Sequence, residues 1–223
     1  MSAVITMEGL TTASKESASI ESARFARANP ARRVAAMSDD EDAQLMLAYA
    51  RGEMRAFETL YSRHRGALYR YLMRQARDGE IANDLFQEVW SRVIVNRSRY
   101  EPRAKFRTFL FTLAHNCFID HCRRTKARPA GMVLEDADAA DMLPADEQLR
   151  PDVKLERDEA TQRYRAALAS LPPEQRDVYL LHEESDLSLE EIARVTGVGA
   201  ETAKSRLRYA VGKLKAALSV VEA

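Results

Sequence analysis

The chain has 223 residues, enough for one large domain or for two small domains joined by a linker. Hydrophobic residues make up 46% and charged residues 30%, with only 8 Gly and 7 Pro, and this composition favours a helical globular protein. No apolar run approaches the roughly 20 residues needed to span a bilayer, and the N-terminus lacks the layout of a secretory signal. Two cysteines are too few for a disulfide framework, so we expect a reduced, cytoplasmic protein.

The formal net charge is zero, because 34 basic side chains balance 34 acidic ones. That balance alone argues against nucleic-acid binding. The distribution reverses the argument: residues 91–128 hold ten Lys or Arg against two acids, residues 131–149 hold six acids and no base, and residues 200–215 hold five bases against one acid. Two basic blocks that flank an acidic one are compatible with two DNA-binding segments.

Residues 1–37 are rich in Ser, Thr and Ala and show little periodicity, so we expect a disordered N-terminal extension. Met37 opens the sequence Met-Ser-Asp-Asp just before the first periodic segment. The sequence leaves open whether translation starts at Met1 or at Met37.

Between Asp42 and Arg124 the hydrophobic pattern is helical, and three stripes recur at steps of three, four or seven residues. Their members are Phe57, Leu60, Tyr61, Leu68 and Leu72; then, after a break at Gly79, Ile81, Leu85, Val89 and Val93; and, on a helix from about 106 to 121, Phe106, Phe109, Leu113 and Phe118. Pro102 separates the last two helices. We therefore predict a compact helical bundle over residues 38–125.

Residues 126–153 carry Pro and Gly among acids and alanines, which predicts a flexible acidic linker. The helical pattern then resumes, with a helix start at Pro172-Pro173-Glu174 and a capping box formed by Ser188 and Glu191. We assign residues 154–223 to a second domain. The predicted fold class is all-α, with an N-terminal helical bundle and a small C-terminal helical domain.

Residues 189–209 have the pattern of a helix, a tight turn at Gly197 and a second helix that is basic. The small apolar residues Ile192, Ala193, Val198, Ala203 and Leu207 suit the seam between the two helices. This predicts a helix-turn-helix, whose second helix enters the DNA major groove. The alternative is an ordinary helical hairpin with a solvated basic face.

Four segments resemble, in order, the conserved blocks of the extracytoplasmic-function (ECF) sigma factors of bacterial RNA polymerase, in the sigma-70 family. They are residues 52–61, 84–90 (Asp-Leu-Phe-Gln-Glu-Val-Trp), 108–124 and 171–176 (Leu-Pro-Pro-Glu-Gln-Arg). The resemblance covers roughly residues 42–124 and 155–217. It implies a sigma factor that directs promoter recognition and transcription initiation, and not an enzyme.

The resemblance also implies roles for individual residues and a set of partners. The residues implied to bind the polymerase core are Asp84, Leu85, Gln87 and Glu88. Those implied to bind and melt the minus-ten element are Arg107, Phe109, Asn116, Asp120, Arg123 and Arg124. Those implied to bind the minus-thirty-five element are Thr202, Lys204, Ser205, Arg206, Arg208 and Tyr209. The implied partners are the polymerase core, promoter DNA and an anti-sigma factor, with no cofactor and no metal. Phe109 replaces the family's usual Trp, and Tyr209 and Val211 stand where Arg is frequent, so the upstream promoter sequence stays open.

Physical chemistry is compatible with these roles, because an unpaired strand is held by hydrogen bonds to base edges and by stacking, without covalent chemistry. Asn116 offers both a donor and an acceptor to a base. The plainer alternatives are core packing for Phe109, a polar surface position for Asn116, and a solvated acidic face for Asp84, Gln87 and Glu88.

Two other classes of protein remain open from the sequence. A one-component transcription regulator would use the helix-turn-helix alone, but would give no reason for residues 84–90 or for the basic block at 91–128. A zinc enzyme would use His115, Cys117, His121 and Cys122, yet no second ligand pair with the usual zinc spacing follows. We further expect the free protein to bind promoter DNA poorly, because the acidic linker can lie against either basic block.

Overall fold

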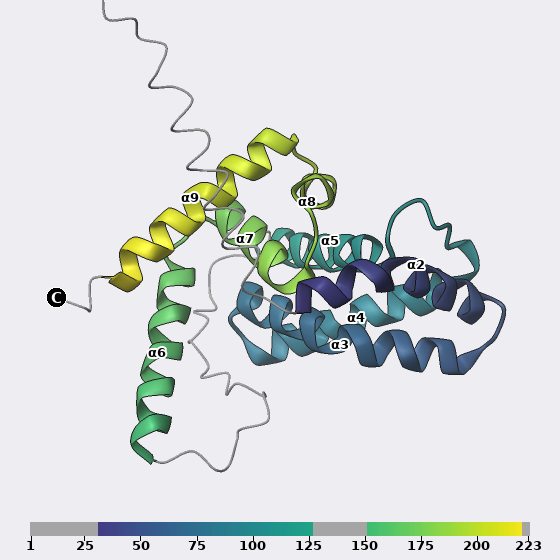
Figure 1. Cartoon of the computed structure of the whole chain (residues 1–223), viewed down its shortest axis with the longest axis horizontal. Helices are drawn as coiled ribbons and strands as arrows, with labels where there is room; N and C mark the ends of the chain where they lie inside the picture. The colour runs from purple at the N-terminus through teal and green to yellow at the C-terminus, as the bar shows by residue number, and fades with distance from the viewer. Residues whose placement is uncertain (1–30, 127–150, 220–223) are drawn as a thin grey trace, which may run out of the picture. The chain divides into compact units, whose positions relative to one another are not determined.

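The computed structural model describes residues 31–126 and 151–219, and every regular element in these two ranges is a helix (Figure 1). The chain separates into two compact units, one ending at Asp39 and the other beginning at Asp40. One helix, Ala31–Ala50, crosses this boundary, and all the other described helices lie in the second unit. The all-α prediction is confirmed.

The helices are α2 (Ala31–Ala50), α3 (Met54–Ala76), α4 (Gly79–Val95), the short 3-10 helix η1 (Arg97–Arg99), α5 (Phe106–Lys126), α6 (Pro151–Ala169), α7 (Pro173–Ser185), α8 (Leu189–Thr196) and α9 (Ala200–Ser219). Helix α2 begins inside the predicted extension, because the segment around Ala35 and Ala36 consists of good helix formers. Helix α6 begins at Pro151, inside the predicted linker. The rest of both segments, residues 1–30 and 127–150, lies outside the described residues.

Helices α3, α4 and α5 pack against one another around an apolar core (Figure 1). The stripes predicted for α3 and α4 face this core: Leu60, Leu68, Leu72, Leu85, Val89 and Val93 are buried, and Phe57, Tyr61 and Ile81 are partly buried against it. Helix α5 differs from the prediction, because Phe109, Leu113 and Phe118 are only partly buried. Its buried apolar side chains are Phe106, Leu110, Phe111, Ala114 and Cys117. The face is displaced because α5 packs against α3, α4 and α8 together, which needs more than one stripe.

The turn between α3 and α4 lies where the sequence indicated a break, although Gly79 does not provide its left-handed residue. Arg77 takes that conformation, with a φ of 58°, and closes α3 by donating its backbone N–H to the Met73 carbonyl. The Asp78 carboxylate accepts from the Ile81 N–H at 3.0 Å and caps α4, of which Gly79 is the first residue. Arg77 therefore ends α3, and the neighbouring Asp78 caps the start of α4.

The helix-turn-helix is formed as predicted by α8 and α9, which meet at a tight turn (Figure 1). The Glu191 N–H donates to Ser188 Oγ at 3.2 Å, and the Ser188 N–H donates to the Glu191 carboxylate at 2.8 Å, completing the capping box. Gly197 ends α8 with a φ of 68°. Ile192 and Ala203 are fully buried at the seam between the two helices.

Two glycines should respond oppositely to substitution, because one lies in the left-handed region and the other inside a helix. At Gly197 (φ +68°) and at Gly212 in α9, an added Cβ would have no atom within 4 Å. We expect Gly197→Ala to lower the free energy of unfolding by about 1 kcal/mol through backbone strain, and Gly212→Ala to raise it by about 0.5–1 kcal/mol. Urea unfolding monitored by circular dichroism measures both. Equal effects of the two substitutions would contradict the assigned turn geometry.

Candidate functional site

The exposed face of α4 carries most of the residues that the sequence assigned to polymerase binding. Asp84 and Gln87 are exposed and Glu88 is partly buried, on successive turns of the helix. Leu85 is only 2% exposed, so it supports this face from the core and is not itself a surface contact. Next to the face lies a hollow of about 290 Å³, lined by Ile81, Asp84, Leu85, Glu88, His121, Arg124 and Thr125. The hollow therefore lies between α4 and the C-terminal half of α5.

A network of ion pairs joins this face of α4 to α5. The Arg92 guanidinium donates to Glu88 at 2.6 Å and lies 3.8 Å from the Asp120 carboxylate. The second oxygen of Glu88 lies 3.7 Å from the Arg124 guanidinium. Arg92 was not among the predicted site residues, although a base four residues after an acid such as Glu88 is a recognisable signal for an ion pair on a helix. The two predicted sites thus share charged side chains.

The C-terminal half of α5 presents a second exposed face beside the first. Asn116, Arg123 and Arg124 are exposed and Asp120 is partly buried. The spacings of four and three residues place Asn116, Asp120 and Arg123 on one side of the helix. An amide, a carboxylate and the Arg123 guanidinium on this side suit contacts with base edges and phosphates, whereas the Arg124 guanidinium is paired with Glu88.

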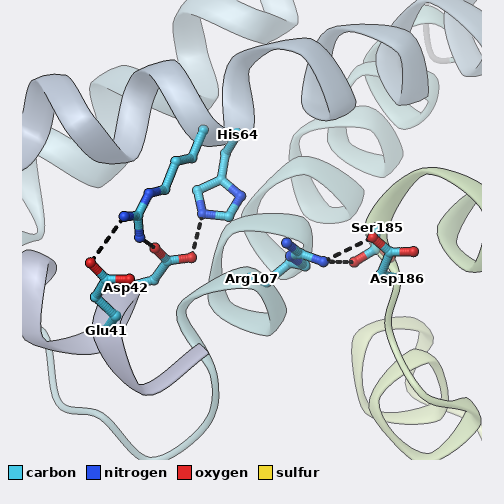
Figure 2. A network of polar contacts seen from close by, with 7 residues as sticks. Glu41, Asp42, His64, Arg107, Ser185 and Asp186 are labelled. Carbon is cyan, nitrogen blue, oxygen red and sulfur yellow. Dashed lines mark hydrogen bonds and ion pairs between the residues drawn. The ribbon is translucent and has the colours of Figure 1, made fainter. Parts of the chain in front are cut away.

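The remaining two residues of the predicted melting set lie at the other end of α5. Phe109 is partly buried and packs on Tyr100 and Phe106, with ring centroids 5.3 and 6.1 Å apart, which supports the packing interpretation. The Arg107 guanidinium donates to the Ser185 carbonyl at 3.2 Å and to the Asp186 carboxylate at 3.1 Å (Figure 2). The structure therefore brings together residues 116–124 and separates Arg107 and Phe109 from them.

The predicted DNA-binding residues of α9 lie along its outer side. Thr202, Lys204, Arg208 and Tyr209 are exposed and Ser205 and Arg206 are partly buried, while Ala203, Ala210 and Leu214 face the core. Tyr209 is 54% exposed, and the Arg208 guanidinium lies over its ring, 5.1 Å from the centroid. An exposed Arg–aromatic pair on the second helix of a helix-turn-helix suits contacts with bases and phosphates.

The cysteines and histidines of α5 do not assemble into a metal site. Within residues 31–126 and 151–219, no three His, Cys, Asp or Glu side chains are grouped so that they could hold a metal ion. Cys117 and Cys122 are not joined in a disulfide, and burial raises the pKa of the Cys117 thiol to about 11. Cys117 therefore behaves as a small core residue. In the same described ranges, no helix is both long enough and apolar enough to cross a membrane.

A buried polar network that the sequence analysis did not identify fixes α2 near the start of α5. His64 Nε2 lies 2.8 Å from one Asp42 oxygen, and the Arg63 guanidinium donates to the other at 2.7 Å (Figure 2). The His64 ring also packs on Phe106, with centroids 5.3 Å apart. Burial raises the pKa of Asp42, but the hydrogen bonds from His64 and Arg63 outweigh it and hold that pKa below its usual value.

Comparisons with known proteins agree with this arrangement. The family described as sigma-70 region 2 matches residues 60–128, and the family described as sigma-70, region 4 matches residues 161–214. The chain is 33% identical over 172 residues to the RNA polymerase sigma factor CarQ of Myxococcus xanthus, covering 77% of this chain and 94% of that protein. It is 30% identical over 173 residues to the ECF RNA polymerase sigma factor SigM of Mycobacterium tuberculosis, covering 78% of this chain and 82% of that protein.

Two solved structures share the fold. CnrH, solved in complex with the cytosolic domain of CnrY, matches with a TM-score of 0.59 and 23% identity over 81% of this chain and 98% of that one. The sigma factor RpoE of Bartonella quintana, solved in complex with the anti-sigma factor NepR, matches with a TM-score of 0.61 and 23% identity over 74% of this chain and 98% of that one.

The network of Asp42 predicts a stability that depends on pH. Because the folded-state pKa is lowered, the stabilisation is complete above the unfolded pKa of about 4 and is lost as the pH falls through the folded value. We expect Asp42→Asn to lower the free energy of unfolding by about 2 kcal/mol at pH 7, and by less below pH ~4. Denaturant unfolding at both pH values measures the difference. The exposed Glu41→Gln, which loses only a surface pair with Arg63, should change it by no more than about 0.5 kcal/mol; equal losses for the two variants would refute the assignment.

Proposed function

The chain belongs to the extracytoplasmic-function group of the sigma-70 family and is an RNA polymerase sigma factor. We propose that its two helical domains carry out different steps of transcription initiation. We assign polymerase binding and promoter melting to the N-terminal domain, residues 38–125. Binding of the minus-thirty-five element falls to the C-terminal domain, residues 154–223. The observation that carries this assignment is the adjacency of the α4 and α5 faces, joined through Glu88, Arg92 and Arg124.

The α4 face binds the polymerase core through Asp84, Gln87 and Glu88. Asp84 and Gln87 are exposed to solvent, so they would give up few interactions within the chain when they bind the polymerase. Glu88 is shared between Arg92 and Arg124, and a cationic group of the polymerase can replace either one. Leu85 keeps the face in place from the core. The hollow beside the face is lined mostly by polar side chains, which suits a reversible contact more than a permanent one.

The α5 face holds the melted minus-ten strand. Asn116 is exposed and reads the edge of an unpaired base, while Arg123 and Arg124 follow the phosphates. The ion pair of Arg124 with Glu88 lies between this face and α4. When the polymerase takes over Glu88, Arg124 becomes available to DNA, so core binding and strand binding support each other.

The α9 helix reads the minus-thirty-five element in the major groove. Thr202, Arg206 and Tyr209 follow at steps of four and three residues and therefore share the side that faces outward, with Ser205 beside them. Lys204 and Arg208 are exposed on another side of the helix, from which they contact phosphates. The Arg208–Tyr209 pair takes the place of the arginines that are frequent in the family.

The protein acts by binding and not by catalysis, and it works in the cytoplasm, where the polymerase is found. CnrH was solved in complex with the cytosolic domain of CnrY, and the sigma factor RpoE of Bartonella quintana in complex with the anti-sigma factor NepR. By analogy, we propose that an anti-sigma factor controls this chain as well. A one-component regulator is less well supported, because it would not need the exposed acidic face of α4.

The first test separates melting from polymerase binding. Asn116→Ala should reduce promoter opening by about tenfold or more, because the base loses a hydrogen-bonding partner that no neighbouring side chain replaces. Affinity for the polymerase core should stay within about twofold, because Asn116 lies outside the α4 face. Permanganate reactivity of promoter thymines in the mutant holoenzyme reports opening, and a core-binding titration gives the control. Wild-type reactivity would remove Asn116 from the base-reading position.

The second test concerns the α4 face. Gln87→Ala combined with Glu88→Lys should weaken binding to the polymerase core by at least about tenfold, because a carboxylate becomes a cation at the contact. Glu58→Lys, at an exposed position of α3, makes the same charge change outside the face and should bind like wild type. Competition with labelled wild-type chain for limiting core measures both, and circular dichroism checks the fold. Equal competition by the double variant would show that α4 does not bind the core.

A further inference from the structure

Tyr209 is a large aromatic side chain of α9 that points away from the core. Ala203, Ala210 and Leu214 of the same helix are buried, and Leu207 packs against the core. Tyr209 is 54% exposed. Single exposed apolar side chains are common, so the role of this one depends on the side of α9 on which it lies.

Tyr209 lies on the side of α9 to which we assign base reading. On a helix, residues three, four and seven apart share one side, so Thr202, Arg206 and Tyr209 form a single row. With a rise of about 1.5 Å per residue, this row is about 10 Å long, the length of about three base pairs. Arg206 and Tyr209 are about 4.5 Å apart along the helix axis, so they meet neighbouring base pairs.

The side chains of this row become longer away from the N-terminal end of α9. A recognition helix enters the major groove with its N-terminal residues closest to the base edges, and the floor of the groove recedes from the later turns. Thr202, in the first turn, needs only a short side chain. Tyr209 begins from a later turn, and its ring spans the extra distance.

Arg208 restrains the Tyr209 ring. Its guanidinium lies over the ring, 5.1 Å from the centroid, and its Nη2 donates to the Tyr209 hydroxyl in a long contact of 3.5 Å. A cation above an aromatic face is held there by electrostatic attraction. The ring therefore loses less conformational freedom when it binds DNA. Because a guanidinium carries five N–H donors, Arg208 can hold the ring and contact a phosphate together.

The chemistry of the ring selects among the four bases. In the major groove only thymine presents a methyl group, on C5, and apolar side chains recognise it by direct contact. Cytosine presents an N4 amino donor in that region, and burying the donor against an aromatic ring would leave it unpaired. Arginine instead pairs with the two acceptors of guanine. Tyr209 and Arg206 therefore favour different bases.

We infer that Tyr209 reads the C5-methyl group of a thymine in the minus-thirty-five element, in the base pair next to a guanine that Arg206 binds. The inference rests on the proposed function and adds which base α9 selects at this point. Tyr209 is thus a specificity-determining residue, and Arg208 is the positioning residue that holds its ring.

The experiment removes the methyl group from the DNA and nothing else. Holoenzyme made from the full chain and polymerase core selects tightly bound DNA from a promoter library whose minus-thirty-five region is randomised. Each thymine of the selected element is then replaced by deoxyuridine, which lacks only the C5-methyl group. At one position we expect wild-type holoenzyme to lose about fourfold in affinity, the effect of burying about one methyl-sized group.

Three variants connect this loss to the side chains of α9. Tyr209→Phe, which keeps the ring, should show the same fourfold ratio, and Tyr209→Ala should bind thymine and uracil equally. Lys204→Gln removes an exposed cation on another side of α9 and should weaken binding to both DNAs alike, with the ratio kept. Circular dichroism checks that each variant folds, which the exposure of both positions favours.

A fourth variant tests for a new preference instead of a loss. Tyr209→Arg should prefer guanine over thymine at the same position by about tenfold, because arginine pairs with the two acceptors of that base. A changed preference at one base pair cannot come from a general weakening of the fold or of phosphate binding.

The possible outcomes separate this inference from the proposed function. If no thymine depends on its methyl group, or if the dependence survives Tyr209→Ala, the inference is overturned and the assignment of α9 to the minus-thirty-five element stands. If wild-type holoenzyme selects no sequence in the randomised region, that assignment fails and the inference fails with it.

Discussion

The burial of α5 against α3, α4 and α8 is the constraint on which the other features of this protein depend. Phe106, Leu110, Phe111, Ala114 and Cys117 face inward over residues 106–117, so the orientation of this part of the helix is fixed by the core. The outward direction of Asn116, Asp120 and Arg123 follows directly from that burial. A helix that is to hold an unpaired strand needs this rigidity, because base recognition fails when donors and acceptors are displaced by about an ångström.

The zero net charge also has a structural meaning. Two basic residues assigned to DNA are paired with acids of the same chain: Arg107 with Asp186, and Arg124 with Glu88. Such pairs keep the surface from binding nucleic acid indiscriminately, since exposed positive charge is what drives non-specific binding. From the sequence we expected the acidic segment 131–149 to compete with DNA for the basic residues, and this segment lies outside the described residues. Within the described residues, acids such as Asp177 and Glu184 of α7 bind polar and basic side chains of α3.

Local patterns explain what could be predicted. The stripes of α3 and α4, the capping box at Ser188 and the left-handed turn at Gly197 depend on residues within one or two helical turns of each other, and each is formed as expected. The face of α5 was displaced, because its position depends on three partner helices. Leu85 was assigned to a surface contact because motif resemblance carries no information about burial.

The long-range polar contacts could not be predicted from the sequence. Asp42 and His64 are separated by 22 residues, and Tyr71 and Asp177 by 106, and no periodicity links such pairs. Their partners are chosen by tertiary packing, which leaves one donor opposite one acceptor after the apolar faces have met. Lone polar residues such as Tyr71 and Asp177 therefore reveal their role only in the folded chain.

The most direct measurement of the central claim is runoff transcription with purified polymerase core on fragments of a genomic library. Transcripts that require both core and this chain, and whose start sites share a minus-ten and a minus-thirty-five element, are the result that our account predicts. Equal transcription with and without the chain, combined with tight sequence-specific binding of the free chain to DNA, would contradict it. That outcome would identify a regulator that acts alone through its helix-turn-helix.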